Sequence, residues 1–439
     1  MLSIFKNLSG NKKKAISNVI WATIGKVARI LTEFIVGIFV ARYLGPEQFG
    51  LMNYVISYVI IFNIIAEFGL SNIEIRELAK CPEERDVLLG SSFTARIILS
   101  TITYILILVS VLLSNADVET STLILIYGST IFFTAFELIR NYFTSIVKNK
   151  YVVITGIIRN IIGALVKVVL LFVDAPLIFF ICALVFDGLI IVGGYITSYK
   201  HEIGKFTWRY DFSIAKSLLK EAFPLLLSGA AVVIYQRIDQ VIIKSMLDNS
   251  AVGYFSVATK FADFLLFIPM IMAQTISPIL VVAKENSYED YRQKAQYYVD
   301  VVTWISIFLS VFTSIFSFYL VRYTFGSEYI SAIPVLQILS FKAILSALQN
   351  SSGQLIIVDG KQKWAVLRNV FGLVMCVVGN YILIPRYGIV GSAWATLITL
   401  SFTGVFGNLI IKPFREYFFM QVKSICFGWK SITKLLKNR

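Results

Sequence analysis

Long apolar stretches recur along the whole chain, and only a few polar residues interrupt each of them. A helix of about 20 apolar residues is long enough to cross the ~30 Å hydrocarbon core of a bilayer. Spans in lipid are helical because their backbone groups have no water to bond. The pattern predicts an all-α polytopic membrane protein of about twelve spans, at residues 15–40, 48–70, 88–113, 121–147, 151–173, 176–199, 218–243, 253–282, 296–321, 331–357, 363–384 and 390–411.

The chain also repeats itself. The segment FVARYLGPEQFGLMNY aligns with IIKSMLDNSAVGYFSV, which places Leu44 on Leu247 and Gly50 on Gly253. Six spans return a chain to its starting side, so the halves are parallel repeats about an axis along the membrane normal. We expect two six-helix lobes around a central cavity. The expected division is a cytoplasmic N-terminal segment at 1–14, an N-lobe at 15–199, a cytoplasmic linker at 200–217, a C-lobe at 218–411 and a basic cytoplasmic tail at 412–439.

Composition supports a membrane protein. The 439 residues are 57% hydrophobic and 15% charged, whereas a soluble domain carries about 25% charged residues. The net charge of +14 does not indicate nucleic acid here, because basic residues hold cytoplasmic loops against an anionic leaflet. One set of alternate loops holds most of the loop Lys and Arg, and the other holds only Arg42, Arg322 and Arg386. Both termini are therefore expected in the cytoplasm.

Polar side chains gather on one face of four predicted spans, at the helical spacing i, i+3, i+4, i+7. An ionisable group at the bilayer centre costs roughly 2.5–3.5 kcal/mol, so it is normally hidden from lipid and functional. These faces are expected to line a wet cavity, which suggests a transporter. The four stripes are Lys26, Arg29 and Glu33; Thr134, Glu137, Asn141 and Thr144; Gly156, Arg159, Asn160, Gly163 and Lys167; and Lys342, Ser346, Gln349, Asn350 and Gly353.

Structural explanations compete with this interpretation. Some charges have an opposite charge three or four residues away and could simply neutralise it. These pairs are Arg29 with Glu33, Glu137 with Arg140, and Lys260 with Asp263. Three other charges, on Arg96, Arg368 and Asp300, lie near predicted cytoplasmic ends, where snorkelling would explain them. Small and amide side chains could instead hold helices together.

Lys167 and Lys342 are harder to explain in structural terms, since neither has a partner on its own helix. Asp187 and Asp239 could answer these lysines across helices, or they could titrate. The first six spans hold more buried cations than carboxylates, which indicates an anionic cargo. Arginine forks and lysine point charges suit phosphate, so we expect the charged part of the cargo to bind the N-lobe.

No catalytic constellation stands out. The chain has no GxSxG, no HExxH and no Walker A motif, so we expect no enzyme, no ATP hydrolysis and no cofactor. Its four cysteines form no CxxC motif and are interpreted as free thiols, with no metal site. Any work must come from an ion gradient, the membrane potential or product withdrawal.

Three segments resemble a known family. They are ARYLGPEQFGLMNYVISYVIIFNIIAEFGL at 41–70, DNSAVGYFSVATKF at 248–261 and LIPRYGIVGSAWATLIT at 383–399. With the spans and charges, they resemble the Wzx-type polysaccharide flippases of the multidrug/oligosaccharidyl-lipid/polysaccharide exporter superfamily. The resemblance implies a V-shaped cavity in a bacterial inner-membrane protein. It implies that a polyprenyl diphosphate-linked oligosaccharide moves from the cytoplasmic to the periplasmic leaflet, for O-antigen, capsule or a similar glycan.

The resemblance also implies roles for the polar stripes. Such families bind the diphosphate with cationic cavity residues, and here that role is carried to Lys26, Arg29, Arg159, Lys167 and Lys342. The amides expected in the same cavity are Asn141, Asn160, Gln349 and Asn350. The carboxylates expected to couple H⁺ or Na⁺, or to balance charge, are Glu33, Glu137, Asp187 and Asp239.

Other proteins of polysaccharide assembly are further candidate partners. Two alternatives to the flippase function stay open at this point. One is a cation-coupled multidrug exporter of the same superfamily, although the excess of basic groups argues against cationic drugs. The other is a membrane glycan polymerase or ligase, which usually has a large periplasmic loop.

Overall fold

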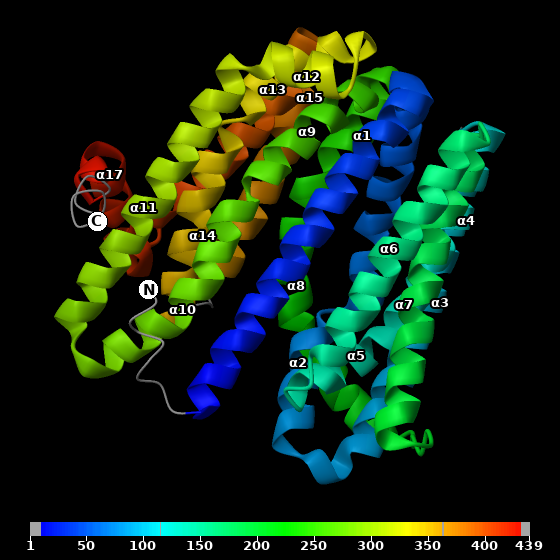
Figure 1. Ribbon diagram of the computed structural model, residues 1–439, viewed down its shortest axis with the longest axis vertical. Coiled ribbons are helices and arrows are strands. Elements are labelled where there is room, and N and C mark those ends of the chain that lie inside the picture. Colours follow the sequence, from blue (N-terminus) through cyan, green and yellow to red (C-terminus); the bar gives the residue numbers. More distant parts are fainter. Residues whose placement is uncertain (1–9, 115, 362–363, 432–439) are drawn as a thin grey trace.

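The computed structural model describes residues 10–114, 116–361 and 364–431. Side chains are described from Arg29 onward, apart from those at 228, 274, 275, 277, 278 and 286. Helices joined by short connections make up most of this described chain, and no strand occurs in it. Figure 1 shows the helices as two groups that converge at the upper end and separate at the lower end, with α1 and α8 running between them.

The helices are bounded as follows. They are α1 (Gly10–Glu67), α2 (Leu70–Lys80), η2 (Pro82–Glu84), α3 (Arg85–Leu113), α4 (Val118–Gly128), η3 (Ser129–Phe136), α5 (Glu137–Ser145), α6 (Lys150–Phe172), α7 (Leu177–Ile203), α8 (Phe212–Met246), α9 (Asn249–Leu265), α10 (Phe267–Asn286), α11 (Tyr288–Ile315), α12 (Ser317–Thr324), η4 (Ser327–Ala332), α13 (Ile333–Leu339), α14 (Lys342–Val358), α15 (Ala365–Ser401), the π-helix η6 (Phe402–Phe406), α16 (Gly407–Ile410), η7 (Lys412–Phe414) and α17 (Arg415–Phe427).

The predicted spans all fall on these helices. By length and composition, eight segments of the described chain are apolar enough to cross a membrane, and ten are if each bent pair counts as one. Two of them contain two predicted spans each. The first is divided at Gly45, with φ of +68°, next to Pro46. The second is divided at Gly388, with φ of +58°. Glycine tolerates this left-handed backbone. Counting each divided segment as two spans raises the ten to twelve, which confirms a fold of roughly twelve spans.

Three hydrophobic clusters explain the splayed shape. At the converging end, one cluster joins helices of both halves, including α1, α4, α7, α9 and α13. There the Tyr329 hydroxyl donates to the carbonyl of Ala41 across the halves, at 2.7 Å. At the separated end, α10, α11, α14 and α17 share a second cluster. A third cluster joins α2, α3, α5, α7 and the first turns of α8. The halves thus share a core at one end only.

The repeated segments meet at the centre of this shared core. A Cβ atom on Gly50 would lie 1.7 Å from the carbonyl oxygen of Asn249, and one on Gly253 would lie 2.1 Å from that of Pro46. The repeat alignment places Gly50 on Gly253 and Pro46 on Asn249. The contact is therefore reciprocal, as it is between repeats related by a two-fold axis. Only glycine permits this close approach of α1 and α9.

The linker between α7 and α8 is shorter than the predicted range of 200–217. Helix α7 continues to Ile203, and α8 begins at Phe212, where the Asp211 carboxylate accepts a hydrogen bond from the Ile214 amide at 3.0 Å. Leu218 and Ala222, in the first turns of α8, pack in the third cluster with α2, α3, α5 and α7. The expected division at 218 thus falls inside a helix that crosses between the halves and bends by 46°.

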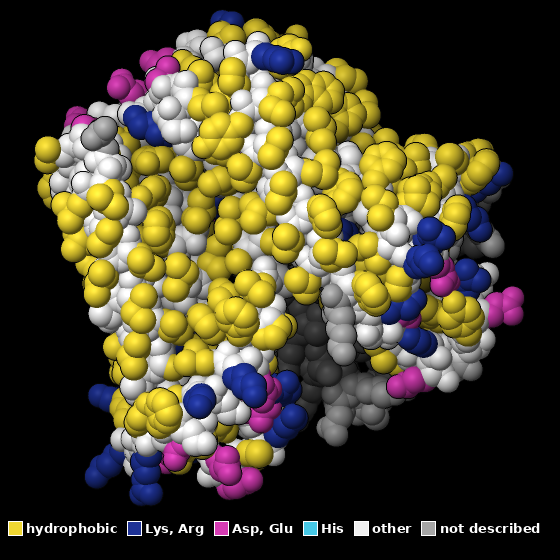
Figure 2. Space-filling model, turned by 180° about the vertical axis from the view of Figure 1, so that it is seen from behind, with side chains coloured by type: hydrophobic (Ala, Val, Ile, Leu, Met, Phe, Trp, Pro, Cys, Tyr) yellow, Lys and Arg dark blue, Asp and Glu magenta, His cyan; other side chains and the backbone are white. Residues whose placement is uncertain are grey.

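Two helices escaped prediction because neither spans the membrane. Helix α2 follows the second span directly, and α17 occupies part of the expected basic tail. The Trp304 indole donates to the carbonyl of Ser424 at 3.0 Å, and this bond attaches α17 to α11. Figure 2 shows hydrophobic side chains over most of the middle of the rear face, with many Lys and Arg side chains at its lower end. This distribution fits a body embedded in lipid.

Candidate functional site

Each half contains a cavity of about 240 Å³. The N-side cavity lies between α1, α6 and α7, and Lys260 enters it from α9. The C-side cavity lies between α8, α9, α14 and α15. Glu33 is the described member of the α1 stripe that lines a cavity, since Arg29 does not. Most of the stripes on α6 and α14 also line the cavities, as Arg159, Asn160, Gly163 and Lys167 on α6 and Lys342, Ser346, Gln349 and Asn350 on α14. The structure therefore gathers many of the predicted polar residues into two sites.

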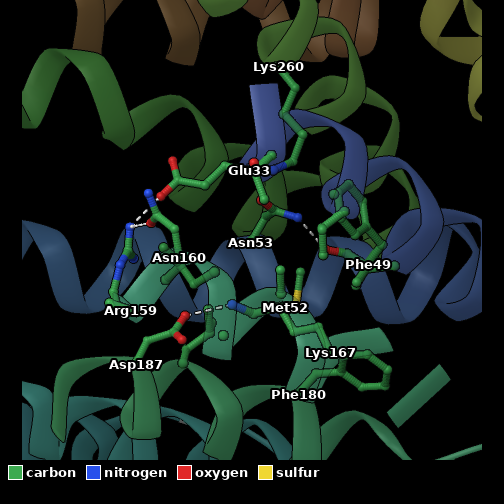
Figure 3. Close-up of a pocket in the computed structure, with 18 residues that line it drawn as sticks. Glu33, Phe49, Met52, Asn53, Arg159, Asn160, Lys167, Phe180, Asp187 and Lys260 are labelled. Atoms are coloured by element: carbon green, nitrogen blue, oxygen red, sulfur yellow. Dashed lines mark hydrogen bonds and ion pairs between the residues drawn. The ribbon is translucent and has the colours of Figure 1, made fainter. Parts of the chain in front are cut away.

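Ion pairs organise the N-side cavity. Glu33 accepts hydrogen bonds from the Arg29 Nε, at 3.0 Å, and from the Arg159 Nη2, at 2.6 Å. Lys167 lies 2.6 Å from Asp187. Figure 3 shows both groups, with Arg159 turned to Glu33 and Lys167 turned to Asp187. Two predicted alternatives are therefore correct, since Arg29 is neutralised by Glu33 and Asp187 answers Lys167 across helices.

A glycine makes room for the second of these pairs. A Cβ atom on Gly163 would lie 2.0 Å from the Oδ1 atom of Asp187. That oxygen is buried and has no hydrogen-bond partner among the described residues. The other oxygen of the carboxylate carries the bond to Lys167. Gly163 thus lets α6 and α7 approach closely enough to hold the ion pair.

Each amide of the N-side cavity already makes one hydrogen bond. Asn160 accepts a hydrogen bond from Arg159 at 2.8 Å. Asn53 donates to the carbonyl of Phe49 at 2.7 Å. Aliphatic and aromatic side chains such as Val36 and Phe180 make up much of the remaining lining. This cavity is therefore charged and apolar, with few polar groups free for a ligand.

Lys260 differs from its predicted arrangement. We expected it to pair with Asp263, but Asp263 instead accepts a hydrogen bond from Lys342 at 2.6 Å. The Lys260 ammonium lies 5.5 Å from the centre of the Phe49 ring. It makes no ion pair with any residue that the structure describes. The proposed neutralisation of Lys260 is wrong, because helix spacing gave the wrong partner for Asp263.

The repeat explains how Lys260 reaches the other half. Under the repeat alignment Lys260 corresponds to Ser57, and Gly37 corresponds to Gln240. Ser57 donates to the Gln240 side chain at 2.6 Å. On the opposite side of the axis, a Cβ atom on Gly37 would lie 3.6 Å from the Lys260 ammonium. A small residue on α1 thus leaves space for a long cation from α9.

A buried carboxylate marks the C-side cavity. Asp239 accepts hydrogen bonds from the Asn380 amide at 2.7 Å and from the Thr396 hydroxyl at 2.8 Å. The Cys376 thiol lies 3.3 Å away. Asp239 is only 4% exposed, and no ion pair reaches it from the described chain. The suggestion that Asp239 answers Lys342 is therefore wrong, since Lys342 bonds to Asp263.

Arg237 also lines the C-side cavity, and sequence analysis missed it. It makes no hydrogen bond or ion pair with the residues that the structure describes. Its charge acts on the Lys260 ammonium, as do the charges of Glu33, Asp263 and Lys167. The sequence could have indicated Arg237, because it is a charged residue inside the predicted span 218–243. It went unnoticed although Gln236, Asp239 and Gln240 follow the spacing i, i+3, i+4 on the same helix.

Gln349 and Asn350 also lie where the stripes predicted them, on the wall of the C-side cavity. The Gln349 amide is 3.3 Å from the Tyr235 hydroxyl. Asn350 is exposed and makes no side-chain bond with the described residues. Gln236 on α8, which sequence analysis also missed, has the same properties.

Asn141 lies outside both cavities, contrary to prediction. It donates at 2.6 Å to Glu74, which also accepts two hydrogen bonds from Arg96, at 2.6 and 3.0 Å, and one from Ser92. Arg96 is fully buried, so the snorkelling explanation is wrong for it. Glu74 was missed because it follows a predicted span. This network is fully satisfied, which points to a structural role.

Glu137 pairs with Arg140 at 2.9 Å, and neither residue lines a cavity. Snorkelling is also wrong for the two remaining charges. Arg368 is buried and donates to Asn408 at 2.9 Å, and Asp300 is buried and accepts from Gln296 at 2.8 Å.

The side chain of Lys26, the last predicted cation, lies outside the described residues. The four cysteines are free thiols. Within the described chain, no group of three or more His, Cys, Asp and Glu side chains is arranged to hold a metal ion.

Two repeated helical halves that share a core at one end and face each other across polar cavities have the architecture of a membrane transporter. Residues 15–284 match the sequence profile of the family described as polysaccharide biosynthesis protein, and residues 224–382 match the MatE profile. The chain belongs to the polysaccharide biosynthesis protein family. This confirms the resemblance noted in the sequence.

Two curated relatives are also named for polysaccharide or glycan biosynthesis. The capsular polysaccharide biosynthesis protein CapF of Staphylococcus aureus is 22% identical over 404 residues, which cover 88% of this chain and 96% of CapF. The probable low-salt glycan biosynthesis flippase Agl15 of Haloferax volcanii is 25% identical over 231 residues, or 52% of this chain and 48% of Agl15.

Solved structures share the fold. The lipid II flippase MurJ, in an inward closed conformation, matches with a TM-score of 0.70 at 16% identity, over 94% of this chain and 92% of MurJ. An inward-facing multidrug resistance MATE family transporter matches with a TM-score of 0.68 at 15% identity, over 90% and 99%. The protein is therefore a multi-pass membrane flippase of this superfamily and not an enzyme. This sets aside the glycan polymerase or ligase.

Proposed function

We propose that this protein moves polyprenyl diphosphate-linked oligosaccharide repeat units from the cytoplasmic to the periplasmic leaflet of a bacterial inner membrane, by alternating access. The products would serve O-antigen, capsule or a similar polysaccharide. One observation carries the proposal. Lys260 lines the N-side cavity and Arg237 the C-side cavity, their charges act on each other, and neither makes an ion pair with the described residues.

Charge balance identifies these two cations as the headgroup site. The other described cations that border the cavities each have a carboxylate, since Arg159 bonds to Glu33, Lys167 to Asp187 and Lys342 to Asp263. Two neighbouring like charges within a membrane protein are costly unless an anion or water compensates them. A diphosphate carries enough negative charge to neutralise both, and its oxygens suit an Arg fork and a Lys point charge.

The paired cations have a secondary role in this proposal. Arg159, Lys167 and Lys342 border the same cavities, so a diphosphate can compete with their carboxylate partners as the halves rock. Arg29 is half-exposed and shares Glu33 with Arg159. The ion pairs thus hold these cations in position when no cargo is bound.

Orientation follows from the basic loops. The helices separate at the lower end of Figure 1, where α2 and α5 lie. Lys80 ends α2, Lys148 lies between α5 and α6, and Lys284 lies in the last turn of α10. Cytoplasmic loops of membrane proteins are enriched in Lys and Arg. We therefore assign the lower end and both termini to the cytoplasm, so that the cavities receive cargo from the leaflet where it is assembled.

Asp239 is our candidate for ion coupling. It is a buried carboxylate whose hydrogen bonds from the described chain all come from neutral groups, including Asn380 and Thr396. Either H⁺ or Na⁺ would neutralise it there. Glu33 and Asp187 already have cationic partners, which makes them poorer coupling groups. Glu137 is likewise paired, with Arg140.

The headgroup site is tested in cells. In a strain that lacks this gene, Lys260→Gln or Arg237→Gln should leave lipid-linked oligosaccharide in the cytoplasmic leaflet. The matched control is Lys150→Gln, which removes an exposed lysine outside both cavities. Normal export by both cavity variants, at normal protein levels, would overturn the proposal.

A multidrug exporter is the second candidate, because residues 224–382 match the MatE profile. A cationic drug would meet Lys260 and Arg237 and be repelled by them. A drug-susceptibility panel separates the two functions. If the deletion strain became sensitive to cationic drugs and exported its glycan normally, the exporter would replace the flippase.

A further inference from the structure

The two cavities differ in the chemistry that they offer a ligand. The N-side cavity presents charges that are paired and amides that are engaged, as in Asn160 and Asn53. The C-side cavity presents Gln236 and Asn350, whose amides are exposed and make no bond with the described residues. Ser346 adds a hydroxyl to the same wall.

Most charged side chains of the C-side cavity are already engaged, which leaves these two amides free to bind a ligand. Lys342 and Asp263 neutralise each other at 2.6 Å, and Asp239 is buried under neutral donors. Arg237 makes no ion pair with the described residues, and its charge acts on Lys260 of the N-side cavity. An amide side chain has both a donor and an acceptor, so this wall can bind a hydroxyl-rich group without requiring charge on it.

We infer that the C-side cavity is the glycan subsite, and that Gln236 and Asn350 hold the sugars nearest the diphosphate by hydrogen bonds. This inference rests on the proposed function, because the diphosphate at Lys260 and Arg237 places those sugars beside the amides. The two amides come from α8 and α14, which both line the cavity. A neutral or N-acetylated hexose matches such a pair of donors and acceptors.

The test separates the sugar from its lipid anchor. Purified protein in nanodiscs is titrated with two probes, which are the lipid-linked oligosaccharide extracted from source cells and undecaprenyl diphosphate without sugar. Gln236→Ala and Asn350→Ala should each weaken binding of the first probe about 5-fold, the value of one ordinary hydrogen bond. Neither variant should change binding of the second probe. Gln337→Ala, an exposed amide on α13 outside the cavity, should change neither.

The outcomes are distinct from those of the proposed function. Lys260→Gln should weaken both probes alike, and its failure to do so would count against the diphosphate site. Equal loss of both probes in Gln236→Ala and Asn350→Ala would mean that the amides serve the headgroup, and no loss of either would mean that the sugars lie elsewhere. Both of these results overturn the glycan subsite, whatever Lys260→Gln shows.

Discussion

At the scale of single residues, the fate of each membrane charge depends on its partner. Arg96 and Glu74 are fully buried and satisfy each other, so they stabilise the fold. Lys260 and Arg237 have no such partner in the described chain and are therefore available to a ligand. The same residue types thus serve structure in one place and function in another.

Removing one member of the buried pair should destabilise the protein. Glu74→Gln leaves the Arg96 charge buried without a counter-charge, which typically costs 3–5 kcal/mol. We expect a clear drop in the thermal unfolding temperature in detergent. Glu77→Gln is the control, because Glu77 pairs with Arg76 at the surface and such pairs contribute about 0–1 kcal/mol. Equal melting temperatures for the two variants would contradict the structural role of Glu74.

Sequence predicted which residues would be polar but not which would meet. The stripes with Arg159, Lys167 and Lys342 were found because helical periodicity is local. The contacts of Lys342 with Asp263 and of Asn141 with Glu74 join helices far apart in the chain, and periodicity holds no information on such packing. Short-range pairing was right for Arg29 with Glu33 and wrong for Lys260.

At the scale of elements, glycines determine how closely helices approach. Gly50 and Gly253 allow the backbones of α1 and α9 to touch at the pseudo-two-fold axis. The apolar pattern predicted the spans themselves well, because burial in lipid selects long hydrophobic runs. It could not predict α2 and α17, which are too polar or too short to read as spans.

Gly253→Ala should disturb the closed end of the molecule. The added methyl would lie 2.1 Å from the Pro46 carbonyl oxygen, so α1 and α9 must move apart. We expect a lower unfolding temperature and reduced glycan export. Gly156→Ala serves as the control, since a Cβ atom there meets nothing within 4 Å and alanine favours a helix by up to about 1 kcal/mol. A Gly253→Ala protein as stable and active as the control would refute the close contact.

An acid-sensitive contact joins α10, α14 and α17 at the lower end. Asp359 bonds to Lys284 and to the Tyr417 hydroxyl, both at 2.5 Å. Burial raises the pKa of Asp359, but these two bonds and the positive charges of Lys284 and Lys361 together outweigh burial and hold the pKa below its ordinary value of 3.8. A lowered folded-state pKa contributes stability above pH 3.8, and that stability is lost as the pH falls through the lowered value.

Asp359→Asn should remove this contribution. We expect the variant to be less stable than the unmodified protein at pH 7, with the difference shrinking as the pH drops below 3.8. Unfolding temperatures measured between pH 3 and pH 7 check this expectation. A difference that grows toward low pH would have the wrong sign for the contact.

At the scale of the whole molecule, one shared core and two separate cores give the halves a fixed end and an open end. Alternating access requires that the two ends exchange these states. The repeat in the sequence predicted this symmetry. It did not show that α8 crosses between the halves, because the hydrophobic pattern is the same whichever half a helix joins.

The assigned orientation predicts labelling by a membrane-impermeant thiol reagent. In a chain whose native cysteines are replaced by serine, Glu119→Cys should react from outside intact spheroplasts, because it lies at the end opposite the basic loops. Lys205→Cys, in the loop between α7 and α8, should react only after lysis. The reverse pattern would invert the topology and the proposed direction of transport.

The most direct test of the account is a structure of the protein with undecaprenyl diphosphate bound in nanodiscs. We predict density for the two phosphates between the halves, within hydrogen-bond distance of the Lys260 ammonium and the Arg237 guanidinium. Phosphate density elsewhere, with these two cations left in water or paired with carboxylates of the chain, would contradict the account.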